Sequence, residues 1–352
     1  MRITANQVTI ARIFCLPFPC WALIARPPDP VMWVAFVFGV LVGATDFVDG
    51  WLARRHGGTT LGALLDPVAD KLFIAMLLVP TVAHGECPGW AAGALFVREL
   101  LITSLRSSMA VRKQSLKTSQ LGKLKTVVQM GGIAVFFLTL FTPPTVMPTV
   151  HLAITIGWAL LAAGWWLKTR HIPLWLIFAP ILWGVIWGAS LVFSPEQVAF
   201  WIFILMVLFT WVSGADYLVG AWRALRATGG INFHDVARIV WSVAHGVALI
   251  PLLDERPELV VPVIVSLCAE LSLGGVENLV AAERGAWAKG SVLPTAIAAL
   301  VVGAAATFNL LPTSTLLVLA WGLAALSIGN LARALWLDRE MFRAHALSSQ
   351  SL

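Results

Sequence analysis

Long apolar runs follow one another along the whole chain, and short polar segments separate them. Each run has about 18–25 residues, which is enough for an α-helix to cross the hydrocarbon core of a bilayer. The pattern predicts an all-α protein, a polytopic transmembrane helical bundle of about twelve spans. The predicted spans are residues 7–26, 31–53, 61–83, 89–111, 122–141, 149–167, 172–192, 198–222, 236–253, 259–281, 291–311 and 314–336.

The basic residues between the runs predict the orientation of the chain. If the N-terminus is cytoplasmic, alternation places almost all connecting lysines and arginines on one side and only Arg26 and Arg256 on the other. This asymmetry follows the positive-inside rule, so both termini are predicted to be cytoplasmic. The composition, 59% hydrophobic and 12% charged, excludes an ordinary soluble protein. The cytoplasmic loops also account for the net charge of +6, so no nucleic-acid partner is expected.

Four aspartates lie where the second predicted span ends and the third begins: Asp46, Asp49, Asp66 and Asp70. An ionised carboxylate inside a membrane span is costly unless it is paired, hydrated or bound to a metal ion. The first two acids are three residues apart and the last two are four apart, so each pair shares one helix face. A Gly-Gly turn between the spans makes them antiparallel neighbours, and both acid pairs are predicted to converge near the cytoplasmic boundary.

Four converging carboxylates repel one another unless cations neutralise them. Hard oxygen ligands suit Mg²⁺ or Mn²⁺, and the cluster predicts a site for two such ions. Small residues accompany the acids: Gly50 and Ala53 share the acid face of the second span, and Gly62 begins the third. Arg54 can reach a phosphate group. Tight helix packing is the alternative explanation for the small residues, but beside the acids they favour a nucleotide diphosphate–metal site.

This set of residues resembles the signature of the CDP-alcohol phosphotransferase family. The matching positions are Asp46-x₂-Asp49-Gly50-x₂-Ala53-Arg54, followed by Gly62-x₃-Asp66-x₃-Asp70. Seven residues separate Arg54 from Gly62 where about eight are expected for the family, and the difference falls in the Gly-Gly turn. The resemblance implies a membrane enzyme that transfers the phosphatidyl group of CDP-diacylglycerol to an alcohol and releases CMP.

The resemblance also implies a role for each matching residue. The four aspartates would bind two metal ions, Mg²⁺ or Mn²⁺, and Asp70 would in addition take the proton from the acceptor hydroxyl. The positions Gly50, Ala53, Arg54 and Gly62 would hold the cytidine diphosphate. Bound metal ions would offset the charge of the pyrophosphate and orient an in-line attack.

Basic residues in the fourth span and at the start of the fifth indicate an anionic acceptor. Arg98 and Glu99 lie within an apolar helix, so they are expected to be paired or functional. Ordinary positive-inside charge is the alternative for the other cations, but their nearness to the acids favours phosphate binding. The predicted acceptor-phosphate ligands are Arg98, Arg106, Lys123 and Lys125.

The pattern RE-x₆-R … GK-x-KT resembles the phosphatidylglycerophosphate synthase branch of the family. The opening NQVTIARIFCLPF resembles the first helix of that branch, with Asn6, Thr9, Arg12 and Pro17 in similar places. The acceptor implied is glycerol 3-phosphate. Cardiolipin synthases share much of this pattern, so another family activity stays open as an alternative.

The resemblance predicts a catalytic domain over residues 1–226, with an inserted helix pair at 149–192. Residues 227–352 form a four-span membrane domain that is either unrelated or a degenerate repeat of the first four spans. In the repeat interpretation, Arg238 corresponds to Arg12.

The same alignment places Glu277 and Asn278 against Asp49 and Gly50. The later segment offers no second pair of acids, so no second active site is expected there. Its in-span acids, Glu270 and Glu277, are expected to pair internally or line a groove.

A membrane transporter is the alternative from a different class, because intramembrane acids and a repeat also suit alternating access. The position of all four acids in two adjacent helices near the cytoplasmic boundary favours the enzyme. We therefore expect an integral protein of the bacterial plasma (inner) membrane with its active site facing the cytoplasm. A homodimer is consistent with the resemblance.

Overall fold

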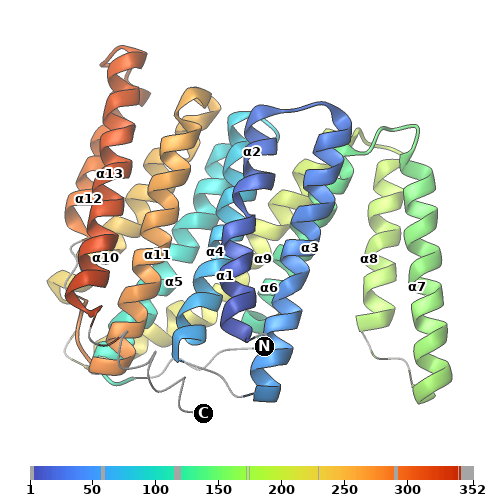
Figure 1. The fold of residues 1–352 in the computed structure, drawn as a ribbon, viewed down its shortest axis with the longest axis horizontal. Coiled ribbons are helices and arrows are strands. Elements are labelled where there is room, and N and C mark those ends of the chain that lie inside the picture. The colour runs from blue at the N-terminus through green and yellow to red at the C-terminus, as the bar shows by residue number, and fades with distance from the viewer. Residues whose placement is uncertain are drawn as a thin grey trace. The chain divides into compact units, whose positions relative to one another are not determined.

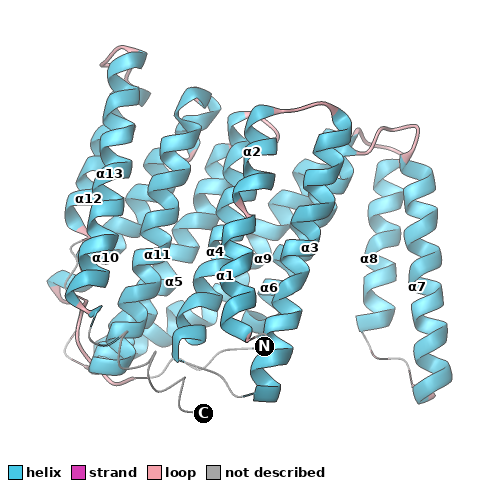
Figure 2. Cartoon of the chain, in the orientation of Figure 1, coloured by secondary structure: helices cyan, strands magenta, loops and turns pink. Residues whose placement is uncertain are grey.

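The computed structural model describes residues 4–56, 60–114, 120–171, 173, 175–228, 230–288, 292–339 and 341. Within these ranges every regular element is a helix, as Figure 2 shows, and the all-α prediction is confirmed. The α-helices, labelled in Figure 1, are α1 (Ala5–Cys15), α2 (Pro17–Ala25), α3 (Asp29–His56), α4 (Thr60–Ala83), α5 (Gly89–Val111), α6 (Gln120–Phe141), α7 (Met147–Thr169), α8 (Trp175–Ser190), α9 (Pro195–Ala227), α10 (Phe233–Ala244), α11 (Val260–Arg284), α12 (Leu293–Thr307) and α13 (Thr313–Leu337). One π-helical and two 3₁₀ turns, His245–Leu249, Pro251–Asp254 and Pro257–Leu259, join α10 to α11.

These helices correspond to the predicted spans, with α1 and α2 together forming the first. In the described part of the chain, eight helical segments are long and apolar enough to cross a membrane. Four other helices do not meet these criteria. Helices α4 and α5 carry charged residues within their apolar runs, and α8 and α12 have only 16 and 15 residues. The chain is therefore an integral membrane protein, while the number of crossings and the side of each terminus stay predictions.

The first segment is shaped by local sequence. The Thr4 hydroxyl accepts a hydrogen bond from the Gln7 backbone, and the Gln7 side chain accepts one from the Thr4 backbone, so both ends of a capping box are present. Pro17 begins α2, where its missing N–H costs least. A second capping box, between Asn232 and Asp235, begins α10.

The described chain divides into two compact units. The smaller unit is 131–206 and contains α7 and α8, the predicted inserted pair. Inside it, the imidazole of His151 stacks on the indole of Trp187 at a centroid distance of 5.6 Å. The insertion itself stays a prediction.

The larger unit joins 1–130 to 207–352. Within it α1 packs against both α3 and α4, and α11 packs against α4, α5 and α13. Two glycines bring the later helices close to α5, because a Cβ at Gly93 would lie 2.4 Å from the carbonyl oxygen of Gly246. Residues 227–352 therefore pack directly on the helices that carry the predicted site.

Candidate functional site

The four aspartates converge, and they do so around Arg12 of α1. Its Nη1 atom donates to Asp46 at 3.0 Å and to Asp70 at 3.2 Å, while Nη2 donates to Asp49. The side chain of Arg12 has no exposed surface, so these ion pairs form where water screens them little. One guanidinium thus joins acids from α3 and α4.

Thr9, one helical turn before Arg12, completes the connection between the acids. Its hydroxyl lies 3.1 Å from Asp49 and 2.9 Å from Asp66, so it can donate to either carboxylate. Thr45 holds the other side of the guanidinium by accepting from Nε of Arg12 at 3.2 Å.

This arrangement corrects one part of the sequence prediction. The spans that carry the acids were expected to be direct neighbours, but α1 packs against both α3 and α4, and its Arg12 and Thr9 lie between the converging acids. The physical reason is charge: carboxylates brought together in a membrane-embedded site need a buried cation, and α1 supplies it. Among the described residues, no three acidic, His or Cys side chains lie close enough to hold one metal ion by themselves.

The donor set nevertheless fits divalent cations in its chemistry. Four carboxylates face one guanidinium, so most of their negative charge is not balanced when all are ionised. Asp46 and Asp70 keep 30% and 27% of their side-chain surface exposed, which leaves oxygens free to bind a further ligand. Hard carboxylate oxygens are the ligands that Mg²⁺ and Mn²⁺ prefer. The four aspartates could therefore hold such ions.

The predicted cytidine diphosphate residues lie beside this cluster. On α3, a Cβ built at Gly50 would lie 3.5 Å from Nη1 of Arg54, so only a flexible, exposed side chain covers the bare backbone. Gly62 is buried near the start of α4. The side chain of Ala53 lies outside the described residues.

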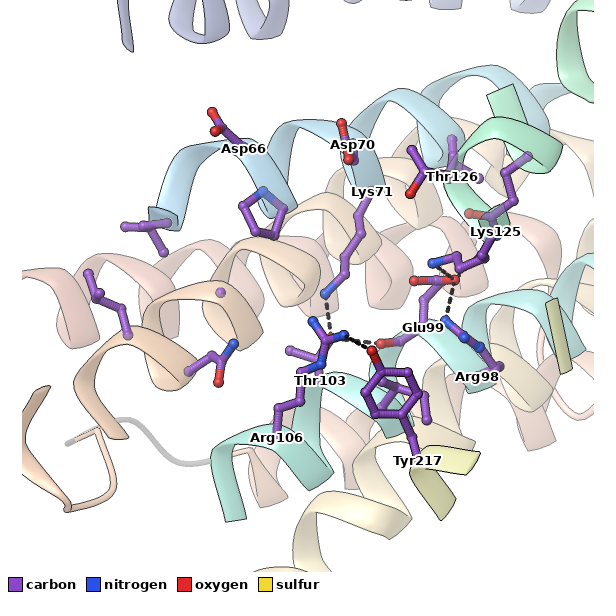
Figure 3. A pocket seen from close by; sticks show the side chains of 18 of the residues that line it. Asp66, Asp70, Lys71, Arg98, Glu99, Thr103, Arg106, Lys125, Thr126 and Tyr217 are labelled. Carbon is purple, nitrogen blue, oxygen red and sulfur yellow. Dashed lines mark hydrogen bonds and ion pairs between the residues drawn. The ribbon is translucent and has the colours of Figure 1, made fainter. Parts of the chain in front are cut away.

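A cavity of about 390 Å³ opens from the acids towards the basic residues. Asp66 and Asp70 line one part of it, and Figure 3 shows both on α4, with Lys71 of the same helix reaching towards Thr103 on α5. Its basic part, which we call the basic end, is formed by Lys71, Arg98, Arg106 and Lys125.

The basic end contains four cations but only one carboxylate, Glu99. That carboxylate accepts from Arg98 at 3.2 Å, from Lys125 at 2.6 Å and from Gln129 at 3.3 Å. Arg98 and Glu99, which were expected to be paired or functional, therefore pair with each other. The cavity keeps an excess of positive charge, as an anionic ligand requires.

Two of the cations are held in place by neutral groups. Arg106 donates to the hydroxyl of Tyr217 at 3.1 Å, and its guanidinium lies 4.9 Å from the centroid of that ring. Lys71 donates to the hydroxyl of Thr103. Neutral partners leave the charge of both side chains available to a ligand.

Arg98 is more enclosed than Arg106 and Lys125. It is buried, donates to Ser213 at 3.4 Å, and has no partner for Nε among the described residues. Gly214 makes room for it, because a Cβ there would lie 2.9 Å from that nitrogen. The side chain of Lys123 lies outside the described residues.

Several residues of the cavity were not predicted from the sequence. Lys71 directly follows Asp70, and a cation inside an apolar helix was the available signal. Thr103 and Thr126 carry no such signal because single hydroxyls are common in membrane helices. The contribution of α11 to the wall could be found only from the packing.

The later helices contain a buried polar cluster of their own. Arg238 donates through Nη2 and Nε to Glu277, at 2.7 and 3.2 Å, and Trp241 donates to Glu270 at 2.6 Å. Of the two expected roles, internal pairing or lining a groove, both glutamates show internal pairing. The pair of Arg238 and Glu277 parallels that of Arg12 and Asp49, while the repeat itself stays a prediction.

Comparison with known proteins agrees with the geometry. A family model described as CDP-alcohol phosphatidyltransferase matches residues 2–169. A CDP-diacylglycerol–glycerol-3-phosphate 3-phosphatidyltransferase of Rickettsia bellii (strain RML369-C) is 34% identical over 134 residues, covering 38% of this chain and 74% of the relative. A protein of the same name from Yersinia pestis (strain Pestoides F) is 38% identical over 136 residues, covering 36% and 71%. No solved structure matches the chain.

Proposed function

The chain belongs to the CDP-alcohol phosphatidyltransferase family, and on this premise we propose that it makes phosphatidylglycerophosphate from CDP-diacylglycerol and glycerol 3-phosphate, with release of CMP. Two relatives carry the names of enzymes for this reaction. The observation that carries the proposal for this chain is one cavity with acids in one part and cations in the other.

The basic end would bind the phosphate of the acceptor. Glycerol 3-phosphate is a dianion, and Lys71, Arg106 and Lys125 offer charge-assisted hydrogen bonds to it. With the phosphate held there, the primary hydroxyl at the other end of the molecule can extend towards Asp66 and Asp70. The cavity thus suits an acceptor with a phosphate at one end and a nucleophile at the other.

Asp70 would act as the general base. It lines the cavity from the same helical turn as Lys71, and it keeps part of its side chain exposed. The acceptor oxygen forms a bond to the phosphatidyl phosphorus, the bond between that phosphorus and the CMP oxygen breaks, and the hydroxyl proton passes to Asp70.

Asp46, Asp49, Asp66 and Asp70 would hold two Mg²⁺ or Mn²⁺ ions, which supply charge stabilisation for the pyrophosphate. Arg12 and Thr9 orient these carboxylates through the contacts already described. Beside them, the bare backbone at Gly50 lets a flat ligand approach α3, and Arg54 can reach a phosphate. These residues, together with Ala53 and Gly62, would hold the cytidine diphosphate.

The proposed setting is the bacterial plasma membrane with the cavity open to the cytoplasm, because both glycerol 3-phosphate and CMP are water-soluble metabolites. The excess of basic residues in the predicted cytoplasmic loops supports this orientation.

The decisive experiment measures CMP release from CDP-diacylglycerol by the purified full chain with a panel of acceptors. Glycerol 3-phosphate should give the highest kcat/KM, and serine, inositol phosphate and phosphatidylglycerol should give little product. A preference for phosphatidylglycerol would instead identify a cardiolipin synthase, and no CMP release with any alcohol would refute the family activity.

A further inference from the structure

One wall of the cavity comes from α11. Gly275, Asn278, Leu279 and Ala282 of this helix line the same space as Asp70 and the basic end. The family model stops at residue 169, so this wall lies beyond the part of the chain that the model matches.

Two glycines let α11 approach the site closely. A Cβ at Gly275 would lie 2.3 Å from Cγ2 of Val68, which stands on α4 between Asp66 and Asp70. A Cβ at Gly274 would lie 3.2 Å from Cγ2 of Thr103 on α5. The backbone of α11 is therefore packed against both helices that carry the site, and its side chains one turn further on reach the cavity.

Asn278 is the polar side chain that α11 presents to the cavity. It is half-buried, and its amide makes no hydrogen bond with any other residue that the structure describes. A half-buried amide without partners is costly unless a ligand or water satisfies it. The amide offers two N–H donors and a carbonyl acceptor, so it suits a neutral hydroxyl, which needs both.

Most of the other polar groups of the cavity are matched to different chemistry. The lysines and arginines can only donate, and they suit the phosphate. Glu99 accepts from three side chains, and the hydroxyls of Thr103 and Tyr217 accept from Lys71 and Arg106. Asp70 faces the attacking hydroxyl in the proposed reaction. The hydroxyl of Thr126 also lines the cavity, but the amide of Asn278 offers two donors and an acceptor at once to the remaining hydroxyl of a polyol phosphate.

We propose that Asn278 binds the second hydroxyl of the acceptor, the one that is neither phosphorylated nor attacking, and so selects a polyol phosphate over a simple hydroxyalkyl phosphate. This inference rests on the proposed function of the cavity. It gives the second half of the chain a direct role in acceptor recognition, although no second metal site is expected there.

The test pairs a change in the enzyme with a change in the acceptor. Wild-type and Asn278→Ala enzymes are assayed for CMP release with glycerol 3-phosphate and with 3-hydroxypropyl phosphate, which keeps the phosphate and the primary hydroxyl but lacks the second hydroxyl. Loss of one neutral hydrogen bond should lower kcat/KM about 3- to 10-fold, mostly through KM for the acceptor. Wild type should therefore prefer glycerol 3-phosphate by about that factor, and Asn278→Ala should remove the preference.

Two controls separate recognition from folding. Ser272→Ala on the same helix removes a hydroxyl that donates to the carbonyl of Cys268 at 2.8 Å, so it should change neither acceptor. Asn278→Leu keeps the side-chain volume and should behave as the alanine variant does. The KM for CDP-diacylglycerol should be unchanged in all three variants.

Equal losses with both acceptors, or no loss with either, would overturn the inference while leaving the proposed function intact. If wild type failed to use glycerol 3-phosphate at all, the proposed function would fall and this inference with it. The two failures are therefore distinguishable in one set of assays.

Discussion

Two of the buried arginine–acid pairs, Arg12–Asp49 and Arg238–Glu277, should respond in opposite ways to loss of the acid. Asp49→Asn should abolish turnover, because Asp49 belongs to the four-carboxylate cluster around Arg12. Glu277→Gln should leave the turnover of each folded molecule nearly intact, because Glu277 contacts Arg238 and does not line the cavity. Its cost should fall on stability instead.

The size of that cost follows from the burial of the pair. The side chains of Arg238 and Glu277 keep only 5% and 1% of their surface exposed. Glutamine preserves the shape and one acceptor oxygen but removes the charge that balances the guanidinium. Trp287, whose ring centroid lies 3.7 Å from Arg238, offers a cation–π contact but no counter-charge. Breaking one partner of a buried pair costs about 3–5 kcal/mol.

The assay combines thermal unfolding in detergent with CMP release normalised to the folded fraction. Glu277→Gln should lower Tm by several degrees and leave kcat nearly unchanged. The double variant Arg238→Met with Glu277→Leu removes both charges and should recover most of the lost stability.

Two results would refute this reasoning. If Glu277→Gln were as inactive as Asp49→Asn with its fold preserved, the second half of the chain would take part in the chemistry. If Glu277→Gln unfolded at the wild-type temperature, the pair would not be a buried structural contact.

Three further predictions concern the site itself. EDTA should abolish CMP release, and added Mg²⁺ or Mn²⁺ should restore it; full turnover in EDTA would exclude the metal site. Asp70→Asn should lower kcat by several orders of magnitude, whereas the control variant Asp216→Asn, at an exposed position, should keep its activity. Arg106→Gln should raise KM for glycerol 3-phosphate about 30-fold, from the loss of about 2 kcal/mol, whereas Tyr217→Phe should raise it only a few-fold. Gly50→Ala should leave Tm unchanged, because the added Cβ meets no atom closer than 3.5 Å, and it should raise the KM for CDP-diacylglycerol. An unchanged KM would show that the nucleotide does not approach this backbone.

The sequence alone determined the helices and much of the catalytic part of the site. Apolar runs of bilayer length dictate spanning helices, because backbone groups in lipid must satisfy their hydrogen bonds internally. The span predicted at 291–311 extends too far: α12 ends at Thr307, and Asn309, a residue that tolerates the left-handed region, leaves the helix with a φ of 51°. The acids were predictable because charges inside apolar segments are rare and their spacing fixes a common face.

Only the tertiary structure decided what stands between and around those acids. Arg12 was visible as a feature of the first helix, but its position between α3 and α4 depends on how α1 packs against both. Lys71 follows Asp70 by one residue, which turns it by about 100° around the helix, and only the neighbouring helices determine which wall it meets. Asn278 reaches the cavity because Gly275 allows α11 to approach Val68 of α4, more than two hundred residues earlier in the chain. Local sequence fixes helical faces through spacing, whereas contacts between distant helices depend on the packing of the whole bundle.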